Sequence, residues 1–330
     1  MSSQEEVDPF NLICKTQVMN KITKMMVAVA AMLILTGSVN AQDSDTSWRL
    51  KALYGLNGTQ SSFVNWNAGG RNNISILGYI ITSANYKKNN LKWDNDLGLA
   101  LGGIQYLNQD QPEDLQKTDD RIELASNFGY KIKEHYYVSL LSSFRTQFMD
   151  GFTDITQPRT SKFMAPGYLS FALGIDYSPN DNFSIFLSPV ASKMTFVQDE
   201  VLANSGSFGV EPAVYDQTTG DVITAGKMFR GEFGAYFRLK YAKEIFTNIE
   251  MKTKLELFSN YMDRPENIDV NAEALFTFKV NSWFSASLNW NLIYDHDIQI
   301  TDSDGNTGPR TQFKSVLGLG VSYTMKNFEK

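Results

Sequence analysis

The sequence is poor in the side chains on which most enzymes and metalloproteins depend. It has one cysteine and two histidines in 330 residues, too few for a zinc site or a disulfide framework. Outside the N-terminus no apolar run approaches about 18 residues, which excludes a bundle of membrane-spanning helices. A net charge of -6 gives no basic field, so we expect no nucleic-acid partner. If the chain crosses a membrane, it must do so with strands.

The N-terminus has the features of a secretory signal peptide. Two lysines precede an eleven-residue apolar stretch at 25–35, and small residues follow it. We expect 1–41 to be a cleaved leader and 42–330 to form one domain. The first eighteen residues lack signal character, which indicates that Met19 is the real start; a genuinely long leader is the alternative.

The remainder of the chain alternates between apolar and charged residues. The pattern is clearest in 229–241, 249–261 and 268–280, where Phe, Leu, Val and Ala occupy one parity and Lys, Arg, Glu and Asp much of the other. Such alternation is typical of strands. These runs exceed the roughly 5 to 6 residues of an average soluble strand and the roughly 9 to 11 that cross a bilayer. Aromatic residues near the ends of these runs match the girdles of membrane barrels.

Turn signals divide the chain into segments of this kind. Short turns at 87–90, 131–134, 179–182, 242–244 and 281–282 alternate with longer connections at 58–72, 105–119, 148–166, 197–227, 262–266 and 297–311. Short periplasmic turns alternate with long outward loops in outer-membrane proteins. The sequence therefore predicts an all-β fold, an antiparallel up-and-down transmembrane β-barrel of about 12 strands, with ten or fourteen strands left open. Pro189 predicts a bulge or a broken strand.

Two stretches carry a resemblance to a known family. The first, 63–98, contains Asn65, Trp66, Gly69 and Gly70; the second is 248–297. They resemble the bacterial outer-membrane family called domain of unknown function 3078, and we expect the resemblance to extend over nearly all of the chain after the leader. It implies a barrel in the outer membrane of a Gram-negative bacterium and brings no activity. We interpret the tryptophan and glycine motif as an anchored structural turn rather than a binding loop.

Charged residues of the C-terminal strands are the main candidate site. On the polar parity they would face the lumen, either as a network of ion pairs that fills it or as the lining of a pore. Because the two signs are nearly balanced, strong ion selectivity is not expected. The predicted lumen-lining residues are Arg230, Glu232, Arg238, Lys240, Glu250, Lys252, Lys254, Glu256, Asp269, Glu273 and Lys279.

Metal and enzyme chemistry have little support. Asp302, Asp304 and Asn306 have the spacing of a calcium loop, but the distal glutamate is missing, which favours a solvated acidic loop. We expect no cofactor. Only His135 and His296 could act as a general base, so a barrel hydrolase is the least favoured function.

The function favoured by the sequence is a small outer-membrane channel or uptake porin for a modest solute. The alternative is a plugged barrel that acts as a binding or structural module through outward loops, above all 197–227. Expected partners are outer-membrane lipid, a small solute and the barrel-assembly machinery, which we expect to recognise the final strand, 313–325.

Overall fold

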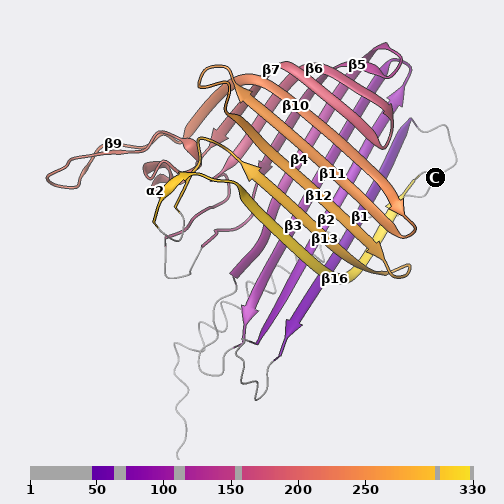
Figure 1. The fold of residues 1–330 in the computed structure, drawn as a ribbon, viewed down its shortest axis with the longest axis horizontal. Coiled ribbons are helices and arrows are strands. Elements are labelled where there is room, and N and C mark those ends of the chain that lie inside the picture. The colour runs from indigo at the N-terminus through magenta and orange to yellow at the C-terminus, as the bar shows by residue number, and fades with distance from the viewer. Residues whose placement is uncertain (1–46, 63–71, 108–115, 153–157, 302–304, 328–330) are drawn as a thin grey trace, which may run out of the picture.

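Twelve long strands pair edge to edge and close on themselves in the computed structural model (Figure 1). The structure describes residues 47–62, 72–107, 116–152, 158–301 and 305–327; the predicted leader lies outside them. Every barrel strand pairs antiparallel with its neighbours, and the first pairs with the last. The predicted all-β, up-and-down barrel of twelve strands is confirmed.

The barrel strands follow one another around the wall in chain order. They are β1 (Trp48–Ser61), β2 (Asn73–Lys88), β3 (Leu91–Tyr106), β4 (Gln116–Lys133), β5 (Tyr136–Thr146), β6 (Gly167–Asn180), β7 (Phe183–Phe196), β10 (Phe229–Phe246), β11 (Ile249–Asn260), β12 (Ile268–Lys279), β13 (Phe284–Tyr294) and β16 (Gln312–Lys326). The start of β1 and the end of β16 lie at the end of the barrel that carries the short turns, which we call the short-turn end. The opposite rim is the long-loop end.

The long connections carry the remaining elements. These are α2 (Glu200–Asn204), the 3-10 turn η1 (Ser207–Gly209) and two small hairpins, β8 (Val214–Tyr215) with β9 (Val222–Thr224) and β14 (Gln299–Thr301) with β15 (Thr307–Pro309). The β8–β9 hairpin reaches away from the barrel wall (Figure 1). The helix was not predicted; its side chain cap is Asp199, which accepts a hydrogen bond from the Leu202 amide at 3.1 Å.

An apolar cluster fixes α2 and η1 at the long-loop end. Leu202 and Ala203 of α2 pack with Val197 and Val210, and Phe208 of η1 packs against them. Phe208 has a φ of 60°, a left-handed conformation that is uncommon for a bulky residue. Its ring also lines the barrel cavity. The connection 197–227 is therefore partly ordered over the mouth of the barrel.

The predicted short turns are found with one displacement. The turn expected at 242–244 is wrong, because Ala242 and Lys243 continue the ladder opposite Lys252 and Met251. The strand β10 instead ends at Phe246, and Asn248, with a φ of 66°, makes the turn. Asparagine tolerates this conformation better than most residues.

The predicted irregularity at Pro189 is a bulge within an unbroken strand. The register of β7 shifts against both neighbours at Pro189. Proline has no amide to donate to the ladder. The Ser188 hydroxyl hydrogen-bonds to the backbone at this interruption of the ladder. It accepts from the Val190 amide at 3.2 Å and lies 2.8 Å from the Leu173 carbonyl.

The outer face of the barrel is apolar. Large side chains that alternate along the strands are exposed there, for example Leu317, Leu319 and Tyr323 at 65%, 54% and 65%. Aromatic pairs such as Trp93 with Phe128 stand on neighbouring strands. A water-soluble barrel rarely exposes so large an apolar surface. Among the described residues no helix has the length and apolarity needed to span a membrane.

Candidate functional site: a charged barrel interior

The barrel encloses a charged cavity of about 2230 Å³. Counted over the described residues, sixteen lysines and arginines and twelve aspartates and glutamates line it, although the whole chain is acidic. The alternation of the strands produces this contrast, because successive side chains point to opposite faces. The interior can therefore hold water and polar solutes, while the outside is suited to lipid.

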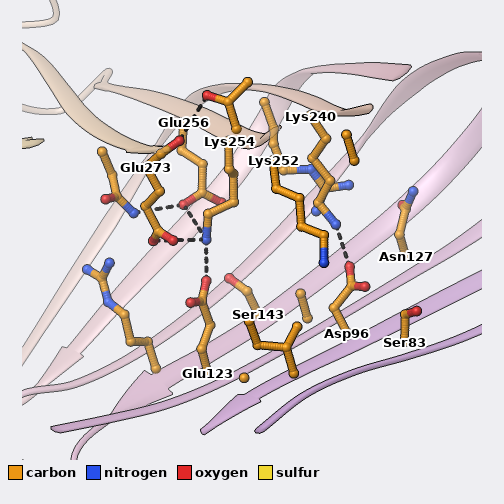
Figure 2. Close-up of a pocket in the computed structure, with 18 of the residues that line it drawn as sticks. Ser83, Asp96, Glu123, Asn127, Ser143, Lys240, Lys252, Lys254, Glu256 and Glu273 are labelled. Atoms are coloured by element: carbon orange, nitrogen blue, oxygen red, sulfur yellow. Dashed lines mark hydrogen bonds and ion pairs between the residues drawn. The ribbon is translucent and has the colours of Figure 1, made fainter. Parts of the chain in front are cut away.

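Lys254 of β11 is the centre of the ion-pair network (Figure 2). Its ammonium contacts the carboxylates of Glu123, Glu256 and Glu273; the last two lie at 3.5 and 3.4 Å. Glu273 is its in-register neighbour on β12, whereas Glu123 lies on β4, five strands away around the wall. One ammonium thus joins two sides of the lumen.

Two further ion pairs cross the lumen. Arg121 of β4 contacts Glu273 at 3.2 Å, and these strands are six apart in a ring of twelve. Lys240 of β10 bonds to Asp96 of β3, again five strands apart (Figure 2). Ion pairs between opposite walls divide the cavity. Removing one member of a buried ion pair strongly destabilises a protein, so each charge here depends on its partner.

Nearer the short-turn end, a single carboxylate serves several lysines. Glu250 of β11 lies 3.4 Å from Lys51, 3.6 Å from Lys252 and 3.8 Å from Lys279. Three cations to one anion make this part of the cavity electropositive. The exposed Arg49 on the same rim pairs with Asp181.

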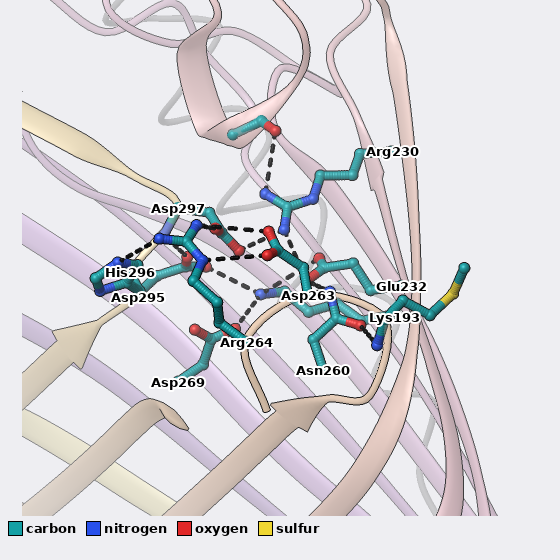
Figure 3. A network of polar contacts seen from close by, with 12 residues as sticks. Lys193, Arg230, Glu232, Asn260, Asp263, Arg264, Asp269, Asp295, His296 and Asp297 are labelled. Atoms are coloured by element: carbon teal, nitrogen blue, oxygen red, sulfur yellow. Dashed lines mark hydrogen bonds and ion pairs between the residues drawn. The ribbon is translucent and has the colours of Figure 1, made fainter. Parts of the chain in front are cut away.

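A second network joins the loops at the long-loop end (Figure 3). Lys193 of β7 lies 2.7 Å from Asp269 and 2.9 Å from Asp295. Arg230 of β10 donates to the Gly209 carbonyl of η1 at 3.0 Å and also bonds to Asp297. This network fixes the η1 segment over the mouth of the barrel.

Arg264 extends this network to the loop after β11. It lies 3.2 Å from the His296 ring and 3.8 Å from Asp297, and it pairs with its neighbour Asp263. Hydrogen bonding and the charge of Arg264 lower the pKa of Asp263, an exposed group outside the barrel strands. The loops after β7 and β11 and the segment after β13 are therefore tied together by charge.

Nine of the eleven predicted lumen-lining residues line the cavity. The exceptions, Arg230 and Glu232, lie instead in the network at the long-loop end, 3.1 Å from each other. The sequence prediction missed the partners on the opposite wall, above all Asp96, Arg121 and Glu123. Their own strands also alternate, so parity would have placed them in the lumen. Which charge they meet depends on how the barrel closes.

The other predicted sites are the tryptophan and glycine motif, the candidate metal ligands and the two histidines. Asn65, Trp66, Gly69, Gly70, Asp302 and Asp304 lie outside the described residues; Asn306 lies inside them. The described part of the chain holds no group of three or more histidine, cysteine, aspartate or glutamate side chains placed for a metal ion. His135 sits in a short turn, 3.5 Å from Glu134. His296 contacts Arg264 and lies 3.3 Å from the Tyr294 hydroxyl.

Two family models match the chain. Residues 56–152 match a family described as a protein of unknown function (DUF3078). This confirms the resemblance for the first stretch, 63–98, but the match does not extend over nearly all of the chain as expected. The second stretch that carried it, 248–297, falls in a different match, of 205–324 to a protein of unknown function, DUF481. The chain has no match among curated proteins.

Solved barrels are similar in outline. The translocator domain of autotransporter NalP from Neisseria meningitidis is 9% identical with a TM-score of 0.34, covering 94% of this chain and 97% of that one. The COG4313 outer membrane channel from Pseudomonas putida F1 is 10% identical with a TM-score of 0.34, covering 88% and 99%. The NanC porin is 8% identical with a TM-score of 0.34, covering 83% and 98%. The architecture described above stands on the strand pairing of this chain alone.

Proposed function

We propose that the protein is an outer-membrane channel for small polar solutes, with a lumen kept narrow by ion pairs between its walls. The observation that carries the proposal is the contrast between an apolar outer face and a charged cavity inside one closed barrel. In lipid every backbone group must be satisfied within the protein, and a closed barrel does this. The same contrast supports a location in the outer membrane, because proteins that span that membrane are typically closed β-barrels.

The ion pairs limit the size of the solute. Lys254 and Lys240 contact carboxylates five strands away, so these side chains reach toward the middle of the lumen. A solute must pass beside them or displace them. This favours small, hydrated molecules over large ones.

The test is solute entry into liposomes that contain the refolded protein. We expect swelling with glycerol and with small amino acids, and a steep fall in rate with the size of the solute. A double variant, Lys252→Glu with Lys254→Glu, should shift the preference of the lumen toward cations. Correct insertion with no swelling in any of these solutes would reject the channel.

The second candidate is a plugged barrel that presents its loops to a partner. The position of η1 favours it: Phe208 lines the cavity and Arg230 holds the adjacent Gly209 carbonyl. In that case the intact barrel would insert without passing solutes, and swelling would begin only after removal of 200–226. If the segment is only a cover over a channel, the intact protein already passes solutes and the same deletion should increase the rate of swelling.

A further inference from the structure

Two arginines inside the barrel lack the carboxylate that strand pairing places beside each of them. Arg145 of β5 is in register with Glu123 of β4, and Arg238 of β10 is in register with Glu256 of β11. Side chains directly opposite on one face of a sheet are ideal ion-pair partners. Here neither pair forms, because both glutamates turn to Lys254.

Glu256 is fully engaged elsewhere. Its carboxylate accepts from the Tyr236 hydroxyl at 2.5 Å and from the Asn271 amide at 2.9 Å, and it lies 3.5 Å from Lys254. Glu123 bonds to Lys254 and lies 3.8 Å from Arg121. Lys254 thus holds the acidic partners of both arginines.

The two guanidinium groups rest on aromatic rings instead. The Arg145 guanidinium carbon lies 4.9 Å from the centre of the Tyr168 ring, and that of Arg238 lies 5.8 Å from the centre of the Phe186 ring. Arg238 is only 4% exposed, and its Nε has no hydrogen-bond partner among the described residues. Both arginines line the cavity. Over the described chain, neither has an ion-pair partner.

Both arginines border the same central network. Each lies beside a glutamate that reaches the Lys254 ammonium, and paired residues have Cβ atoms about 5 Å apart. A guanidinium presents its N–H groups as a fixed fork that matches a carboxylate. Leaving such a group buried and unpaired is costly, and a bound anion would remove that cost.

We propose that Arg145 and Arg238 bind the carboxylate of a small monovalent organic acid as it passes Lys254. The inference rests on the proposed function for the route by which the acid enters. A single negative charge is preferred over a double one, because the carboxylates of Glu123, Glu256 and Glu273 surround the same network and repel added charge.

The test is binding of propionate to the refolded protein in detergent micelles, measured by saturation-transfer NMR. Propionamide has nearly the same shape without the charge and is the control ligand. We expect saturation transfer to propionate and little to propionamide. Arg145→Gln and Arg238→Gln should each weaken binding about tenfold, the range expected when a charge-assisted hydrogen bond is lost. Lys133→Gln, an exposed change outside the cavity, should bind as the parent does.

A third variant tests the reason why the arginines are available. Lys254→Gln keeps both arginines but releases Glu123 and Glu256, which can then pair with them. We expect propionate binding to fall in this variant as well, with the barrel still folded by circular dichroism. Equal binding in the parent and in both arginine variants would overturn the site, and so would tighter binding of inorganic phosphate at pH 8 than of propionate.

The outcomes separate the site from the channel. Binding of propionate without any solute flux would reject the channel and keep the site. Flux without charge-dependent binding would keep the channel and reject the site.

Discussion

Ser188 shows how one side chain repairs an interruption in the barrel wall. The residue is fully buried and lies in the bulge that Pro189 imposes on β7. Its hydroxyl accepts from the Val190 amide, and the Leu173 and Val190 carbonyls both lie 2.8 Å from it. Loss of this hydroxyl would remove the hydrogen bonds that it makes with these backbone groups.

We predict that Ser188→Ala lowers the free energy of unfolding by about 1–3 kcal/mol, the cost of a buried polar group that loses its hydrogen bond. Urea unfolding of the refolded barrel in vesicles measures this. Ser170→Ala, a cavity-lining position on the adjacent strand, is the control and should change stability by less. Equal effects at the two positions would contradict the role given to the bulge.

For single residues, the sequence predicted which side chains face the lumen but not which side chains they contact. Parity placed Lys254 and Glu273 in the lumen, and the structure agrees. The contact of Lys254 with Glu123 joins residues 131 positions apart. It depends on strand tilt and on closure of the wall, which one strand does not encode. That contact also leaves Arg145 and Arg238 without their carboxylate partners, so this feature could not be predicted from the sequence either.

Among the elements, the connection between β7 and β10 differs most from a simple loop. Arg230 holds the Gly209 carbonyl, and the α2 cluster packs behind it. Strand lengths and all the short turns but the one after β10 were predictable, because each follows from local periodicity and turn residues. The order in 197–227 was not, since its helix has only five residues and is stabilised by contacts with distant segments.

We predict that Arg230→Gln loosens the η1 segment. Loss of a charge-assisted hydrogen bond should speed hydrogen exchange of the amides in 205–211 about tenfold. Exchange measured by mass spectrometry on the refolded protein tests this, with Arg49→Gln at the short-turn end as the charge-matched control. Unchanged exchange in 205–211 would mean that the apolar cluster alone holds the segment.

The turn of the β8–β9 hairpin should respond to pH. The Asp216 carboxylate accepts from the amides of Thr218 and Thr219 at 2.7 and 3.0 Å, and these bonds lower its pKa. Because the pKa is lowered in the folded turn, the ionised carboxylate stabilises the turn. This stabilisation is complete at pH values above the usual aspartate pKa of about 3.9. This stabilisation is lost as the pH falls through the lowered value. NMR protection factors for the two amides should decrease in that range, and Asp216→Asn should remove the dependence.

For the whole molecule, one closed wall separates an apolar exterior from a charged interior that its own ion pairs narrow. Fold class and strand number follow from periodicity repeated along the chain. The width of the lumen does not follow from periodicity, because it depends on side chains that meet from opposite walls. The chain has an excess of acidic residues, yet basic residues are in excess around the cavity, and only the closed barrel shows that distribution.

The most direct test of the account is single-channel conductance in planar bilayers. The parent protein and a double variant, Glu123→Gln with Lys254→Gln, which removes the central cross-lumen pair without changing net charge, are compared at the same salt concentration. We predict a small, steady conductance in the parent and a several-fold larger one in the variant. Equal conductance would contradict the claim that ion pairs narrow the lumen, and inserted protein without current in either form would contradict the channel itself.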